Sequence, residues 1–130
     1  MIRLPSEQQV ASATSDVTVH GLITEIDPDV RNHNGGRHQI FSVQIDQVIM
    51  HTASAPVTAG DVVNVAIRFG DGQGLAHAIP GLAVGQPITL SGAYVKFDTA
   101  YPEQDGDRHA VIHYTHHPIG WVEYQGVHYE

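Results

Sequence analysis

Hydrophobic and polar residues alternate along several short stretches of the chain, as they do in half-buried β-strands. Residues 37–50 show the pattern most clearly. One face of that stretch carries Phe41, Val43, Ile45 and Ile49, and the other carries His38, Ser42, Gln44 and Asp46. Residues 62–69 repeat it, with Val63, Val65, Ile67 and Phe69 predicted to point inward and Asn64 and Arg68 outward. Both stretches are therefore predicted to be strands with one buried face.

Further strands are predicted from β-branched or alternating stretches between turn-forming segments. They cover residues 17–26, 88–97 and 109–115, and residues 120–130 form a last strand or hairpin that packs Trp121 and Tyr124. Gly21 is expected to bend the first strand, and Gly92 to allow a sharp coil in the later one. Residues 27–36 and 98–108 read as loops, and residues 70–85 as a glycine-rich connection with at most one helical turn.

Five strands with little helical periodicity predict an all-β fold, namely a small five-stranded OB-like Greek-key barrel with at most one short helix. An open β-sandwich is the competing arrangement. The length of 130 residues fits one domain, which we place at residues 17–130, after a flexible N-terminal arm over residues 1–16. Neither a long apolar run nor a signal-peptide pattern is visible, so we expect a soluble, cytoplasmic protein without membrane contact.

The charge of the chain limits its partners. Six basic residues and a net charge of −8 disfavour an extensive nucleic-acid footprint, because such binding depends on Lys and Arg. A short nucleic acid or a small anionic ligand stays compatible with this composition. Cysteine is absent, which excludes disulfides and thiolate metal ligands. The unusual feature is the presence of ten histidines, whose protonation between about pH 5 and 7 would cancel the negative charge.

Four of these histidines lie in the segment 109–117. In a strand, His109, His113 and His117 would share the outward face with Val111 and Thr115, while Ala110, Ile112 and Tyr114 would face the core. Residues four apart on a strand are about 13 Å apart, whereas metal–nitrogen bonds are about 2.0–2.1 Å, so a straight strand cannot chelate an ion with such a pair. A site would need a cross-strand partner or a bend near Pro118.

The cross-strand partner that fits best is His38, and His20 and His51 fit less well. We therefore take His38, His113, His116 and His117 as candidate ligands of a divalent transition metal such as zinc. The simpler alternative is that these are ordinary surface histidines, since no metal-binding motif such as HExxH is present.

The same segment permits chemistry without a metal. Arg37 and Arg108, each followed by a histidine (His38 and His109), are candidate anion contacts. His38 and His113 are candidate catalytic residues, because two imidazoles of opposite protonation can act as general base and general acid. A metal- or histidine-dependent phosphodiesterase or nuclease is thus an alternative function, and an acidic interaction or inhibitor protein without catalysis is another.

Several strings, kept in order over about residues 20–129, resemble those of an uncharacterised family of small bacterial proteins. They are Arg37-His38-Gln39-Ile40-Phe41, Gly92-Ala93-Tyr94, His113-Tyr114-Thr115-His116-His117-Pro118, Gly120-Trp121 and Gly126-Val127-His128-Tyr129. This chain lacks the Asp expected between His117 and Pro118, and its link from Pro118 to Gly120 is short. The resemblance implies an OB-like fold and one recurring constellation of His38, His113, His116 and His117. The leading hypothesis is therefore an OB-like binding domain with a histidine-lined polar site for a divalent metal or a small anionic ligand.

Overall fold

The computed structural model describes residues 16–28, 31–33, 36–52, 57–70, 72, 74–95, 110–113, 115–117 and 119–130. Its strands are β1 (Asp16–Ile26), β2 (Arg31–His33), β3 (Gly36–His51), β4 (Val62–Phe69), β5 (Pro87–Val95), β6 (Val111–His113), β7 (Trp121–Tyr124) and β8 (Val127–Tyr129). None of these residues forms a helix. In particular, the described part of the chain contains no helix suited to crossing a membrane.

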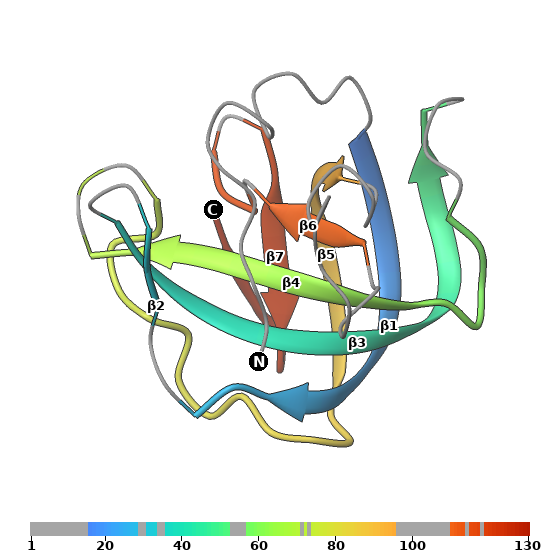
Figure 1. Cartoon of the computed structure of the whole chain (residues 1–130), viewed down its shortest axis with the longest axis horizontal. Helices are drawn as coiled ribbons and strands as arrows, with labels where there is room; N and C mark the ends of the chain where they lie inside the picture. Colours follow the sequence, from blue (N-terminus) through green and yellow to red (C-terminus); the bar gives the residue numbers. More distant parts are fainter. Residues whose placement is uncertain are drawn as a thin grey trace, which may run out of the picture.

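Five of the strands close into a barrel (Figure 1). β1 pairs with β3 and β3 with β4, all antiparallel, β4 runs parallel to β6, and β6 pairs antiparallel with β5. β5 then pairs with β1, which closes the sheet. The order β1-β3-β4-β6-β5 with one parallel pair is that of an OB-like Greek-key barrel. The predicted fold class is therefore confirmed, and closure rules out the open sandwich.

The remaining strands extend this barrel. β2 pairs with β3 as a hairpin, so the segment predicted as a loop over residues 27–36 contains a short strand. β7 adds to β5 and carries β8 as the last strand of the sheet. β1 begins at Asp16, one residue before the predicted boundary, and the rest of the predicted arm, residues 1–15, lies outside the described residues.

The core lies inside the barrel and consists of the apolar side chains that alternate along each strand. They include Val17, Val19, Ile23, Phe41, Val43, Ile45, Val63, Val65, Ile67, Phe69, Ile88, Leu90, Tyr94, Ile112, Val122 and Tyr124. The predicted inward faces of β3 and β4 are thus confirmed, with one exception. Ile49 is 51% exposed, while Val48 packs against the core.

Two bulges explain the exposure of Ile49. Along the β1–β3 ladder the pairing skips Asp46 and later Ile49 on β3. One extra residue in a strand reverses which side chains face the core, because alternation has a period of two. A strictly alternating pattern therefore places Ile49 wrongly, since the sequence does not reveal the bulge at Asp46.

The long connection between β4 and β5 is anchored without a helix. Leu75 forms an isolated bridge with Phe69, so the predicted helical turn is not found at the described residues there. Gln39 on β3 pins the connection further, because its side chain donates to the Ile79 carbonyl (3.0 Å) and accepts from the Ile79 amide (2.8 Å). The Gln39 side chain thus forms the two hydrogen bonds that a neighbouring strand would otherwise provide.

Candidate functional site

The outer face of β3 and β4 corresponds to the ligand-binding face of OB folds. Its polar residues pair across the two strands, His38 opposite Arg68 and Ser42 opposite Asn64. Ser42 Oγ donates to Asn64 Oδ1 at 3.0 Å. These side chains point away from the core as predicted, but they are buried and not half exposed, with His38 only 1% and Arg68 7% exposed. A polar layer therefore lies outside the barrel core.

β6 brings the second histidine to this layer. Ala110 and Ile112 join the core as predicted, so His113 faces the opposite side, where it is 3% exposed. The rings of His38 and His113 lie with their centroids 5.2 Å apart and their planes at 45°. Strand β4 lies between β3 and β6, and its pairing with β6 at Asn64–Val111 and Val65–Ile112 sets where His113 joins this layer. The expected cross-strand approach of His38 to His113 is thus present in the structure.

The turn after β6 holds the next two histidines in different environments. Thr115 is fully buried and donates through Oγ1 to the Ala66 carbonyl (3.1 Å), which ties this turn to β4. His116 is buried and its Nδ1 lies 2.9 Å from the His117 carbonyl oxygen. A carbonyl only accepts, so Nδ1 carries the proton and Nε2 is the unprotonated nitrogen in the neutral ring. The His117 side chain is 77% exposed and lies 3.4 Å from Glu130.

The predicted metal ligands are therefore not gathered into one cluster. Among the described residues, no group of three or more histidine, aspartate or glutamate side chains is placed to hold a metal ion. His38 and His113 form a close pair, and His117 is turned to solvent. The weaker candidates bond elsewhere, His20 to Asp46 (2.7 Å) and His51 to the Thr52 carbonyl (2.8 Å).

Of the two candidate arginines, only Arg37 lies within the described residues. Arg37 is exposed, and its guanidinium lies over the Phe69 ring, 4.9 Å from the ring centroid, in a cation–π contact. Arg108 and His109 lie outside the described residues. The sequence analysis did not single out Arg68 as a site residue, although its place on the polar face of residues 62–69 was the signal that could have found it.

The aromatic residues of the C-terminal hairpin lie in different environments. Tyr124 is buried in the core, and its hydroxyl donates to the Gly81 carbonyl at 2.7 Å. Tyr129 packs against that core from the edge. Trp121 instead stacks on the imidazole of His128, with 5.4 Å between ring centroids and 33° between planes.

His128 is the centre of a charged network on this hairpin. Its Nδ1 lies 3.1 Å from Glu123 and its Nε2 lies 2.9 Å from Glu130. Carboxylates accept hydrogen bonds, so both ring nitrogens must donate, which requires the charged imidazolium. The hydrogen bonds to Glu130 and Glu123 accordingly raise the pKa of His128 above 6.5. In return, His128 and then His117 lower the pKa of Glu130 below 4.5.

We expect a proton NMR titration to place the midpoint of the His128 ring above pH 6.5. The raised pKa means that its contribution to hairpin stability is complete below pH 6.5 and is lost as pH rises through the folded value. The Glu130 contribution is complete above pH 4.5 and is lost as pH falls. The double variant Glu123→Gln/Glu130→Gln should lower the His128 midpoint. An unchanged midpoint in this variant would contradict the network.

Comparison of the chain with models of protein families and with curated proteins finds no match. The resemblance to an uncharacterised family therefore stays a prediction. What the chain does has to be argued from the barrel and from the residues on its outer face.

Proposed function

We propose that this chain is an OB-type binding domain whose outer histidine layer takes a divalent metal or a small anionic ligand. The observation that carries the proposal is the pairing of His38 and His113, two imidazoles from distant parts of the chain, 5.2 Å apart on the face that OB folds use for binding. Both are almost completely buried. Polar groups at such positions are retained against a desolvation cost, which favours a specific role over a surface one.

The ring separation supports the metal version. Two imidazoles on one tetrahedral zinc, with nitrogens about 2.0–2.1 Å from the metal, hold their ring centroids roughly 5 Å apart. His116 follows in the same turn, and its Nδ1–H bond to a backbone carbonyl leaves Nε2 in the form that binds metals. His38 and His113 are the proposed ligands, with His116 as a third if the turn closes over the ion.

The anion version uses the same layer. Arg68 lies directly opposite His38 across the β3–β4 ladder and presents a buried guanidinium, a group suited to carboxylate or phosphate. A metal held by two or three imidazoles also leaves a coordination position that an anion can fill. Metal and anion are therefore compatible occupants of one site.

The test is elemental analysis of untagged protein purified without added metal or chelator, followed by titration with zinc and with inorganic phosphate. We expect a ligand to bind near one per chain and to be lost in His38→Ala and His113→Ala. His77→Ala is the matched control, because His77 is exposed on the β4–β5 connection. Binding that survives both layer variants, or no binding of either probe, would reject the proposal.

A phosphodiesterase or nuclease is the second candidate, favoured by the adjacency of the two candidate catalytic residues, His38 and His113. Neighbouring imidazoles can supply the general base and general acid of phosphodiester cleavage. Incubation with single-stranded DNA, RNA and cyclic dinucleotides, with and without metal, tests this. Cleavage abolished in His113→Ala would support an enzyme, and no cleavage under any condition would leave the binding domain.

A further inference from the structure

A second site lies away from the histidine layer, on the surface formed by β1, β5, β7 and β8. Four residues face one another in a row across these strands, since register pairs His20 with Thr89, Thr89 with Glu123, and Glu123 with His128. Side chains paired across neighbouring strands share one face of the sheet. The row therefore places an imidazole, a hydroxyl, a carboxylate and a second imidazole side by side.

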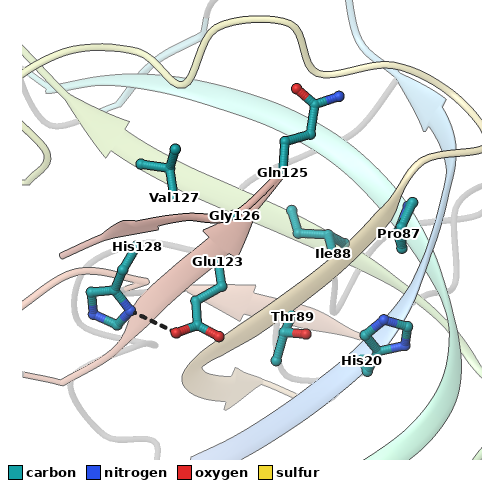
Figure 2. A pocket seen from close by; sticks show the side chains of 9 residues that line it. All are labelled: His20, Pro87, Ile88, Thr89, Glu123, Gln125, Gly126, Val127 and His128. Carbon is teal, nitrogen blue, oxygen red and sulfur yellow. Dashed lines mark hydrogen bonds and ion pairs between the residues drawn. The ribbon is translucent and has the colours of Figure 1, made fainter.

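This row lines a cleft of about 440 Å³, a size typical of small-molecule sites. Pro87, Ile88 and Val127 add apolar walls, and Gln125 and Gly126 of the hairpin turn stand beside it. Figure 2 shows the Glu123 carboxylate between His128 on one side and Thr89 and His20 on the other. The cleft thus combines apolar walls with a row of polar groups.

Hydrogen-bond roles make this row rich in acceptors. His20 Nδ1 must donate to Asp46 Oδ1, so the neutral ring has its acceptor at Nε2. Glu123 Oε2 accepts from His128, and its other oxygen, Oε1, has no hydrogen bond to any described residue. The hydroxyl of Thr89 likewise has none within the described part of the chain and can accept. The complement of such a row is a group with several N–H donors.

The local charge points the same way. Three carboxylates, those of Asp46, Glu123 and Glu130, contact the two imidazoles of the row. Hydrogen bonds to Glu130 and Glu123 favour the charged form of His128 and raise its pKa, so one imidazole faces two carboxylates. The carboxylates are about half exposed, which leaves them open to a ligand. A metal ion does not fit here, because both ring nitrogens of His128 are bonded to carboxylates and cannot act as ligands.

We propose that this cleft binds a guanidinium or ammonium group, seated on Glu123 Oε1 with Thr89 and His20 as neighbouring acceptors. Its bearer is either a small free cation or an Arg or Lys side chain of a protein partner. In both cases the cleft would recognise the same group, a planar or tetrahedral set of N–H donors that hydrogen-bonds to a carboxylate. The apolar walls contact the hydrocarbon part of the bearer. This site shares no residue with the proposed histidine layer, so the two can be tested separately.

The experiment is a titration of the full chain with arginine amide acetylated at its α-amino group, monitored by the amide chemical shifts of residues 88, 89 and 123–128. Trp121, the only tryptophan, stacks on His128 and gives a second readout by fluorescence. We expect saturable changes with this acetylated arginine amide and none with the equally acetylated citrulline amide, its uncharged isostere. Glu123→Gln should weaken binding at least about tenfold, because a charge-assisted hydrogen bond is lost.

Thr89→Val keeps the charge of the cleft and should weaken binding to a smaller extent. Glu25→Gln removes an exposed carboxylate of β1 that does not line the cleft, and should change nothing. A blocked Gly-Arg-Gly peptide separates the two sources. Tighter binding of the peptide than of arginine amide supports a protein partner, and equal or weaker binding supports a free cation. Equal binding of citrulline amide, an equal loss in Glu25→Gln, or no saturable change with either cation would overturn the proposal.

Discussion

Replacing Tyr124 with alanine is expected to lower the free energy of unfolding by about 3–5 kcal/mol, the range for large aromatic side chains removed from a core. Tyr124 comes from β7, outside the five-stranded barrel, yet it is one of the largest fully buried side chains. Its ring belongs to the main core, and its hydroxyl donates to the Gly81 carbonyl. Urea unfolding followed by circular dichroism measures the effect.

Tyr124→Phe is the matched variant, because it keeps the ring and removes only the hydroxyl. It should cost about 1 kcal/mol, since the Gly81 carbonyl loses its donor. A Tyr124→Ala protein as stable as the wild type would mean that the C-terminal hairpin is not part of the folded core. The comparison thus separates ring packing from the hydrogen bond.

Gly92→Ala is expected to destabilise the protein by about 2–3 kcal/mol, as overpacking in a fixed backbone does. A Cβ at this position would collide with the carbonyl oxygen of His113 and would lie 3.1 Å from Thr115 Cγ2. These atoms belong to β6 and the turn after it, so the strand would have to move. Because the same strand carries the His113 ring, ligand binding at the histidine layer should fall as well.

Gly126→Ala is the control for this variant, because it is also strained but meets no neighbour. Gly126 has φ of 79°, with nothing within 4 Å of an added Cβ. Its substitution should cost only about 1 kcal/mol and leave the histidine layer unchanged. Differential scanning calorimetry of both variants, together with titration of the layer ligand, makes the comparison. Equal losses at the two glycines would show that backbone freedom, and not close approach to His113, explains Gly92.

The alternating pattern by itself determined the barrel strands and, up to the bulge at Asp46 on β3, the direction of their side chains. Phe41, Val65 and Ile112 face the core as the pattern predicts, and His38 and His113 face away from it. Side-chain alternation is a local property of an extended backbone, so short windows of sequence are enough to predict it. The same local signals indicated five barrel strands and special roles for Gly21 and Gly92, and both glycines prove to be points of close approach.

Only the tertiary structure decided which of these faces meet. The parallel pairing of β4 with β6 brings His113 to His38, and the closure of β5 on β1 brings His20 to Thr89. Such pairings join distant segments, and their register depends on bulges and loop closure that leave little trace in composition. Burial also depended on the tertiary structure. The alternation along β4 predicts an exposed outward face, but the residues of that face are buried. The local pattern indicates which way a residue points along a regular strand, whereas bulges and the neighbours of that residue depend on the packing of the whole chain.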